Sequence, residues 1–350
     1  MKNNNIKDNI CVIATGKGMG NFFSNIAYFK QIYREEGCRI TFLTRKLTSA
    51  ADVFKDQSFC EKVYYIDEYK RGLRGLFENL LSFFNIIKLI NKINPKKIFI
   101  LHSSSRYTMA SILSNVSLKN IYAPGYKLQN FLIKNENKIF KSYFSKPLEP
   151  KLENKLLVEK IYDKKITEDN SIKLNYYKKK EYVCITIAQS GISRQWGKNN
   201  HIKIIEYLIT KRFKNFLILS GPLQKDMEDQ ISTYFADKVN LIKTSELKMN
   251  DCLDLLKRSI FYVGNDTGFP HLSISLKIPT VVIHGDCVPH FHLYDEQNLI
   301  YSVDTDYPAI RKPGSDTAIK SISVDKVKAA VDNLLADHKI LTKLERWPSG

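Results

Sequence analysis

A polar turn between two apolar runs is the first candidate site in this sequence. In VGNDTGFPHLSISLKIPTVVIHGD (263–286), Asp266, Thr267 and Gly268 separate a strand-like run from a segment that has Pro270 near its start. Proline suits the first turn of a helix, and a helix start attracts phosphate through its free N–H groups and its dipole. The Thr267 hydroxyl, close backbone approach at Gly268 and the Asp266 carboxylate suit a phosphorylated sugar. An ordinary strand–helix turn capped by Asp or Thr explains the same residues.

A second polar loop follows the apolar run EYVCITIA (181–188) and reads QSGISRQWG. Ser190 could supply a hydroxyl and Arg194 a fixed positive charge for a diphosphate. Taken alone, Arg194 suits a surface position and Trp196 a packing position. Two such loops at the strand ends of one domain together indicate a pocket for a nucleotide sugar.

The elements that must position these loops alternate between strands and helices. Helical apolar faces are predicted over 22–37, closed by Gly37, and over 75–94, which stops before Pro95. Strands are predicted at 9–15, 38–44, 62–67, 96–103, 181–190, 215–221, 238–244, 259–266 and 279–286. This alternation predicts an α/β fold with two parallel sheets. Ligands of such sheets bind outside the carboxyl ends of the strands, where the two polar loops lie.

Composition limits the class of protein. With 350 residues, of which 43% are hydrophobic and 26% charged, the chain can build two globular cores. No apolar run approaches the roughly 20 residues that span a bilayer, and the N-terminus has no signal-peptide core. The six cysteines are scattered without metal-ligand spacing, which fits a reducing compartment. We therefore expect a cytoplasmic protein.

Nearly all of the net charge of +18 lies in the first half of the chain. Residues 1–180 hold 33 Lys and Arg against 16 Asp and Glu, whereas residues 181–350 hold 21 against 20. A lysine-rich proteome would raise the total but would not readily explain this asymmetry. The basic half indicates an anionic partner: a phosphorylated glycan, an acidic membrane surface or a nucleic acid. A nucleic acid is the least favoured, because no recognisable binding module is present.

Four places in the chain resemble the bacterial heptosyltransferases, glycosyltransferase family 9, which have the GT-B fold. DTGFPHL at 266–272 is similar to the family's D-T-G-x-x-H-L. Residues 188–197 resemble its donor loop, with two small polar residues, a basic residue and a tryptophan. Met19–Phe22 resembles its M-G-D-hydrophobic turn, and His102–Arg106 resembles a strand-end loop with serine and a basic residue.

The resemblance implies two Rossmann-like domains that face each other across a cleft. An acceptor-binding domain would occupy 1–175, with basic loops and a linker at 130–175, and a nucleotide-sugar-binding domain 176–322. A C-terminal helix at 323–350 would pack back on the N-terminal domain. The implied reaction is inverting transfer of a heptose or related sugar, typically from ADP-heptose, without metal or cofactor. The acceptor would be an anionic surface glycan such as lipopolysaccharide core, with the basic half resting peripherally on the inner membrane.

The resemblance also assigns roles residue by residue. On the donor side, it implies contacts from Ser190, Arg194, Asp266, Thr267, Gly268 and His271. Thr267 and Gly268 would bind the diphosphate, and Arg194 replaces the commoner lysine, which keeps the charge but changes its geometry. On the acceptor side, the candidates are Lys17, Gly20 and Arg106.

One departure from the family pattern concerns the catalytic base. The M-G-D turn carries the aspartate that takes the acceptor proton, but here the position is Asn21, and an amide is no base. Three explanations stay open. In the first, a different residue serves as the base, and the titratable groups nearby in sequence are Lys17, His102, Glu35 and Glu36. In the second, the alignment is displaced, against which Gly18-Met19-Gly20 argues. In the third, the chain is a slow or inactive relative that only binds nucleotide sugars. The intact donor-side residues favour an enzyme.

The other motifs in the sequence are weaker evidence for function. GKGMGN (16–21) lacks the third glycine of a dinucleotide-binding loop and the pattern of a P-loop. His284, His290 and His292 have no convincing ligand-spaced carboxylates, so structural or sugar-contact roles are favoured over metal binding. Asp286, at the end of the last apolar run, is a lesser pocket candidate.

Overall fold

The chain divides into two compact units, Met1–Glu168 and Asp169–Gly350, each of which is described by itself. The computed structural model describes residues 9–16, 18–67, 73–101, 104–124, 150–167, 169–173, 180–188, 191–285, 299–307, 310 and 314–344. The division falls at residue 168, whereas the sequence placed it at 175. The Ile172 N–H donates to the Ser275 carbonyl at 2.9 Å, which ties the start of the second unit to that unit.

The first unit is built on a five-stranded parallel sheet with the order β3-β2-β1-β4-β5. The strands are β1 Ile10–Ile13, β2 Ile40–Thr44, β3 Cys60–Tyr65, β4 Lys97–Ile100 and β5 Ile121–Tyr122. Every residue of β1 and β2 is buried, as expected for strands covered on both faces. The chain order reverses between β1 and β4, so a switch point lies at their carboxyl ends.

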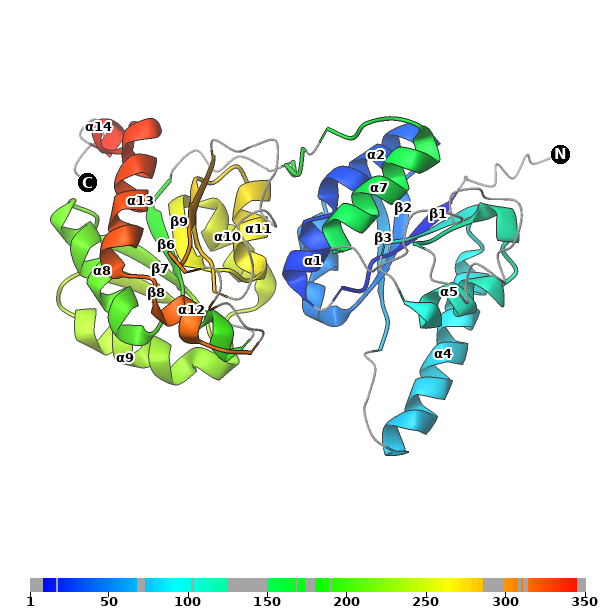
Figure 1. The fold of residues 1–350 in the computed structure, drawn as a ribbon, viewed down its shortest axis with the longest axis horizontal. Coiled ribbons are helices and arrows are strands. Elements are labelled where there is room, and N and C mark those ends of the chain that lie inside the picture. Colours follow the sequence, from blue (N-terminus) through cyan, green and yellow to red (C-terminus); the bar gives the residue numbers. More distant parts are fainter. Residues whose placement is uncertain are drawn as a thin grey trace. The chain divides into compact units, whose positions relative to one another are not determined.

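Helices cover this sheet (Figure 1). They are α1 Met19–Phe23, α2 Ile26–Glu36, α3 Ala50–Phe54, α4 Leu73–Ile93, α5 Ser105–Ile112 and α7 Pro150–Tyr162. Phe22, in α1, packs within 5.2–6.0 Å of the rings of Phe29, Phe42 and Phe54. This aromatic cluster fixes the α1 turn, and with it Asn21, against β2.

The second unit contains a six-stranded parallel sheet with the order β11-β10-β9-β6-β7-β8. The strands are β6 Tyr182–Thr186, β7 Asn215–Leu219, β8 Asn240–Lys243, β9 Ser259–Asn265, β10 Thr280–Ile283 and β11 Ile300–Val303. Chain order reverses between β6 and β9. The predicted strands all appear, whereas β5 and β11 were not predicted, β5 being only two residues long.

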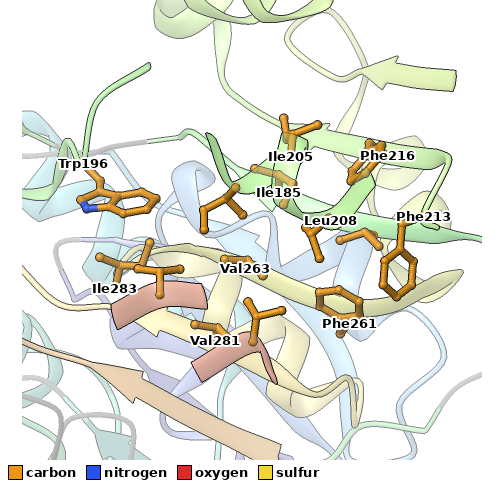
Figure 2. Packing of buried hydrophobic residues seen from close by; sticks show 14 of the residues in the cluster. Ile185, Trp196, Ile205, Leu208, Phe213, Phe216, Phe261, Val263, Val281 and Ile283 are labelled. Carbon is orange, nitrogen blue, oxygen red and sulfur yellow. The ribbon is translucent and has the colours of Figure 1, made fainter. Parts of the chain in front are cut away.

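Helices pack on both faces of the second sheet, with α8 Lys198–Thr210 and α13 Val324–Asp337 in contact with each other. The others are α9 Lys225–Phe235, α10 Met249–Lys257, α11 Gly268–Ser275, α12 Thr317–Lys320 and α14 Ile340–Leu344. Figure 2 shows the core, in which Phe213 and Phe261 pack edge to face with ring centroids 5.3 Å apart. No helix in the described ranges is long and apolar enough to cross a membrane.

The C-terminal helix α13 packs on the sheet of the second unit. Val327, Val331 and Leu334 belong to the core of that unit. The Tyr301 hydroxyl of β11 also donates to Asp337 at 2.8 Å, which ties the end of the helix to the edge strand. The expected packing of residues 323–350 on the N-terminal domain stays a prediction.

Candidate functional site

The two polar loops predicted to bind a nucleotide sugar begin side by side. One follows β6 and the other follows β9, and these strands pair with Thr186 opposite Gly264. A Cβ on Gly264 would lie 2.7 Å from the Thr186 Cβ and 2.9 Å from its carbonyl oxygen. Only glycine permits this approach, so the strand ends meet closely at the switch point of the sheet.

The Asp266 turn is held by backbone bonds and a cap. The Asp266 N–H donates to the Ile283 carbonyl at 3.0 Å, and the Thr267 hydroxyl accepts from the Phe269 N–H at 3.4 Å. Thr267 is therefore the N-cap of α11, as expected for an ordinary strand–helix turn capped by Asp or Thr. Asp266 is 3% exposed and His271 is also buried, so both lie inside the turn rather than in solvent.

The loop after β6 is anchored by Trp196, as predicted for a packing residue. Its side chain is 2% exposed, its Nε1 donates to the Ile322 carbonyl at 2.8 Å, and it joins the core in Figure 2. Two residues earlier, Arg194 is half-buried in a 3-10 turn, Ile192–Arg194. Because Trp196 is fixed, the backbone of the turn that carries Arg194 has a defined place at the carboxyl edge.

The end of β10 also contacts this loop. A Cβ on Gly285 would lie 1.9 Å from the Ser193 carbonyl oxygen, so any larger residue would displace the turn that carries Arg194. The loops after β6, β9 and β10 thus form one packed edge. The glycine of the second Gly-Asp pair is needed for this contact; its neighbour Asp286 lies outside the described residues.

Tyr262, in β9, is a buried residue at this edge that sequence reasoning missed. Burial raises the pKa of its phenol well above the usual range, and the nearby Cys184 thiol and Asp266 carboxylate add to the effect. The side chains of Thr186 and Thr267 act in the opposite direction. The phenol therefore lies neutral beneath both strand ends. A tyrosine within an apolar run gives no sequence signal for this placement.

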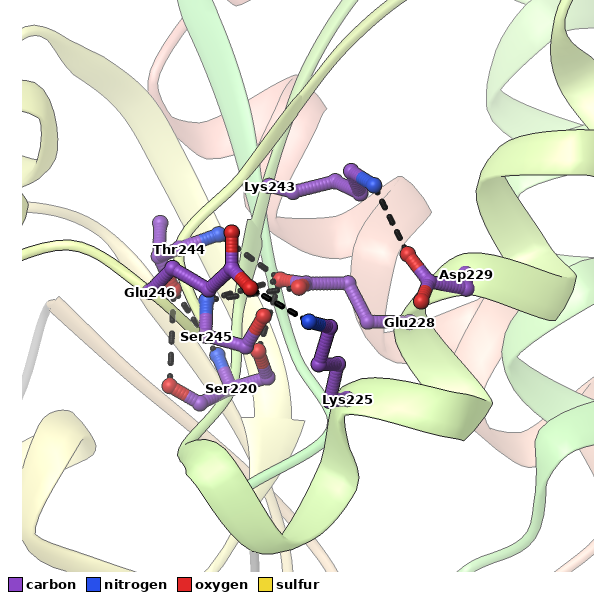
Figure 3. A network of polar contacts seen from close by, with 8 residues as sticks. All are labelled: Ser220, Lys225, Glu228, Asp229, Lys243, Thr244, Ser245 and Glu246. Carbon is purple, nitrogen blue, oxygen red and sulfur yellow. Dashed lines mark hydrogen bonds and ion pairs between the residues drawn. The ribbon is translucent and has the colours of Figure 1, made fainter.

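A buried carboxylate organises the loops after β7 and β8. Glu228 accepts hydrogen bonds from the Ser220 hydroxyl at 2.6 Å, the Thr244 N–H at 2.7 Å and the Ser245 N–H at 3.3 Å (Figure 3). A carboxylate with three donors is stable when buried. Nothing in the sequence singled out Glu228, because its partners lie up to 17 residues away.

In the first unit, Asn21 is exposed in the first turn of α1, after the loop that follows β1. A Cβ on Gly16 would lie 2.5 Å from the Asn21 Cβ, so the glycine lets the loop close against this side chain. Glu35 and Glu36 do not belong to this edge. Glu36 pairs with Lys97 at 2.8 Å at the start of β4, which is the opposite edge of the sheet, and Glu35 pairs with Lys164. They are therefore wrong as candidates for the base.

The β1 and β4 loops are joined by Asn154 of α7. Its Nδ2 donates to the Asn25 Oδ1 at 2.9 Å and to the Leu101 carbonyl at 3.3 Å. Asn25 in turn donates to the Asn21 carbonyl at 2.5 Å. The neighbouring Glu153 is a buried carboxylate that the sequence analysis did not single out. Its 1% exposure favours a structural role over contact with a bulky acceptor.

Arg106, predicted on the acceptor side, begins α5 just after β4. Its guanidinium donates to the Ser82 hydroxyl of α4 and lies over the Tyr107 ring, 5.8 Å from the centroid. Gly20 lies in the first turn of α1 beside Asn21. Three other predicted positions, Lys17, His102 and Ser190, lie outside the described residues.

The histidines give no support for a metal site. His284 is buried, with its Nε2 3.2 Å from the Ser302 hydroxyl, which is the structural role that was favoured. His290 and His292 lie outside the described residues. Within the described ranges, no three His, Cys, Asp or Glu side chains gather so as to hold an ion.

Comparison with known proteins identifies this arrangement. Residues 119–315 match the family model of glycosyltransferase family 9 (heptosyltransferase), which is more than half of the chain. The chain belongs to glycosyltransferase family 9. The predicted family is confirmed, and with it a glycosyltransferase. No curated protein matches the sequence.

Solved structures agree with the family 9 assignment. The family 9 glycosyltransferase from Veillonella parvula has 13% identity and a TM-score of 0.72, over 94% of this chain and 97% of that chain. E. coli heptosyltransferase WaaC with ADP-2-deoxy-2-fluoro heptose has 13% identity and a TM-score of 0.69, over 93% and 99%. E. coli ADP-heptose lps heptosyltransferase II has 10% identity and a TM-score of 0.63, over 95% and 99%. At these identities the likeness establishes the fold, and the predicted GT-B fold is confirmed.

Proposed function

We propose that this family 9 chain transfers a heptose or related sugar from a nucleotide diphosphate, ADP-heptose being the first candidate, to an anionic surface glycan such as lipopolysaccharide core. The observation that carries the proposal is the packed edge formed by the loops after β6, β9 and β10. It brings the Asp266 turn and the Arg194 loop together at the switch point of one sheet, where α/β proteins bind their ligands.

The donor's diphosphate suits the start of α11. Helix N-termini favour phosphate, and Arg194 would add a fixed positive charge that stabilises the leaving nucleotide diphosphate. Asp266 and His271 would contact the sugar, and Ser190 the phosphates. With cationic and dipolar groups in these places, the leaving group needs no metal ion, so we propose a metal-independent enzyme without a cofactor.

The reaction would be a single displacement with inversion. An acceptor hydroxyl attacks the anomeric carbon from the face opposite the diphosphate, the bond from carbon to the diphosphate oxygen breaks, and the hydroxyl proton passes to a base. Asn21 cannot accept that proton. We propose His102, which directly follows Leu101 at the end of β4, because an unperturbed histidine is largely neutral at pH 7 whereas Lys17 would be charged.

The acceptor is proposed to bind the first unit. The first half of the chain, residues 1–180, contains this unit and carries almost all of the excess positive charge, with 33 basic residues against 16 acidic ones. Arg106, Gly20 and Lys17 are the proposed contacts near the β1–β4 switch point. A phosphorylated glycan fits such a surface better than a neutral one.

A second candidate function rests on Asn21 itself. An amide at the position of the family's base suits a relative that binds a nucleotide sugar without transferring it. Such a protein would bind the donor with the same residues and show neither transfer nor hydrolysis.

Mass spectrometry of the acceptor separates the two candidates. The full chain is incubated with ADP-heptose and heptose-deficient lipopolysaccharide core, with and without EDTA. We expect an added heptose mass in both samples. Donor binding without any product would support the second candidate, and activity lost with EDTA and restored by one metal would contradict metal independence.

A further inference from the structure

The helix α4 exposes a stripe of large apolar side chains. Phe77 is 67% exposed, Leu80 51%, Leu81 49% and Phe84 52%. At 3.6 residues per turn these four positions fall on one face. The opposite face is already used: Ile86 and Ile90 are buried in the core of the first unit, with Phe83 and Ile87 packed against it. The four side chains of the apolar stripe therefore do not contribute to the core of the first unit.

The stripe lies beyond the carboxyl edge of the first sheet. Arg106 lies in the first turn after β4, at the carboxyl edge of the sheet, and its guanidinium donates to the Ser82 hydroxyl of α4. Ser82 therefore lies level with this edge. Residues before Ser82 continue past it, and Figure 1 shows the first turns of α4 extending beyond the other elements of its unit. The stripe thus borders the switch point where the acceptor is proposed to bind.

Two exposed lysines follow the stripe along the helix. Lys88, exposed one turn after Phe84, lies on the same face, and Lys92 is exposed one turn further on. Over its own length, Leu73–Ile93, the helix carries three basic residues, Arg74, Lys88 and Lys92, against one acidic residue, Glu78. Apolar side chains flanked by cations are the pattern of a helix that lies in the interface of an anionic membrane. Helix α4 does not qualify as a membrane-spanning helix.

We propose that α4 docks this protein on anionic phospholipid bilayers, with Phe77, Leu80, Leu81 and Phe84 in the headgroup–acyl boundary. Lys88 and Lys92 contact lipid phosphates, which makes the attachment peripheral and sensitive to salt. Docking at this helix would hold the acceptor-side edge of the sheet near the bilayer surface. The docking itself needs neither donor nor acceptor, so it stands or fails separately from the proposed sugar transfer.

Vesicle flotation of the full chain tests the proposal. Vesicles of equal parts phosphatidylethanolamine and phosphatidylglycerol are compared with phosphatidylcholine alone. We expect flotation with the anionic vesicles, a loss at high salt, and a drop of about tenfold or more for Phe77→Ser/Phe84→Ser. The matched control is Leu223→Ser in the second unit, where Leu223 is 92% exposed, and it should float like the wild type. Equal flotation of wild type and the double variant would overturn the proposal.

A fluorescence measurement does not depend on the serine variants, which could misfold. It also shows whether another segment of the chain or a second copy covers the apolar stripe of α4. In Phe84→Trp, with the wild-type spectrum subtracted, emission should be that of an exposed indole and should shift to the blue on adding anionic vesicles. Blue emission without vesicles would mean that another segment of the chain or a second copy already covers the stripe. Emission that does not change with vesicles would likewise overturn the proposal.

Discussion

Asn154 and Asn25 are joined side chain to side chain, with the Asn154 Nδ2 2.9 Å from the Asn25 Oδ1. Both residues are buried, and 129 positions of sequence separate them. Because Asn25 also holds the Asn21 carbonyl and Asn154 the Leu101 carbonyl, this pair fixes the loops after β1 and β4 relative to each other at the switch point of the first sheet.

Removing this link should loosen both loops. Asn154→Ala leaves the Asn25 oxygen and the Leu101 carbonyl without this donor in a buried place, which costs about 1–3 kcal/mol of unfolding free energy. Urea unfolding measures the loss, and sugar transfer should fall while ADP-heptose binding in the second unit stays unchanged. Asn85→Ala, at an exposed position of α4, is the matched control. A variant as stable as the wild type would show that the link is dispensable.

The switch point of the second sheet should not tolerate a methyl group. Gly264→Ala places a Cβ within 3 Å of Thr186, and overpacking of this kind costs about 1–3 kcal/mol. Thermal unfolding should therefore shift downwards, and donor affinity should fall because β9 carries the Asp266 turn. Gly18→Ala is the control, since a Cβ there has no neighbour within 4 Å. If both alanine variants behave alike, the strand contact is not tight.

His201 makes stability depend on pH. Burial against the core lowers its pKa from 6.5 to about 4. The unfolded chain takes up a proton below about pH 6.5 while the folded protein does not, so stability is lost as pH falls from 6.5 towards 4. The loss should reach about 2 kcal/mol at pH 5. His201→Leu should reduce the difference in unfolding free energy between pH 7 and pH 5 by about 2 kcal/mol. An unchanged difference would contradict the role of His201.

The proposed base can be tested with a rescue. His102→Gln should lower the rate of transfer by about 10²–10⁴-fold without changing ADP-heptose binding. In that background Asn21→Asp puts a carboxylate at the exposed first turn of α1, where the helix dipole keeps it ionised, and should restore part of the rate. Restoration would place the acceptor hydroxyl beside residue 21. An active His102→Gln protein would remove His102 from the mechanism.

The parallel sheets and the polar loops after β6 and β9 could be predicted because they depend on local sequence. Buried strands such as VCIT and the Asp-Thr-Gly turn carry their own composition and spacing. Glu228 and Asn154 could not be found in this way, because each acts on backbone and side-chain groups distant in sequence. The sequence shows a glycine at position 285, but its close contact with Ser193 depends on how β10 lies in the sheet and cannot be read from the sequence.

The loops of the first sheet were less predictable. Glu35 and Glu36 follow the Asn21 turn closely in sequence, yet α2 carries them to the opposite edge of the sheet, where Glu36 pairs with Lys97. Sequence distance is a poor guide to position once a helix of 11 residues intervenes. The C-terminal helix could be predicted as a helix, but its composition does not indicate which sheet it covers; Val327, Val331 and Leu334 lie in the core of the second unit.

Calorimetry of nucleotide binding tests the central claim, that the edge formed by the β6, β9 and β10 loops binds the donor. ADP-heptose, ADP, UDP and GDP are titrated into the wild type, Asp266→Ala, Arg194→Ala and the control Lys203→Ala, an exposed cation of α8. We predict that one nucleotide family binds the wild type and the control alike, and that both site variants bind it at least about tenfold more weakly, a difference of 1.4 kcal/mol or more. Binding of no nucleotide, or equal binding by all four proteins, would contradict a donor site at this edge.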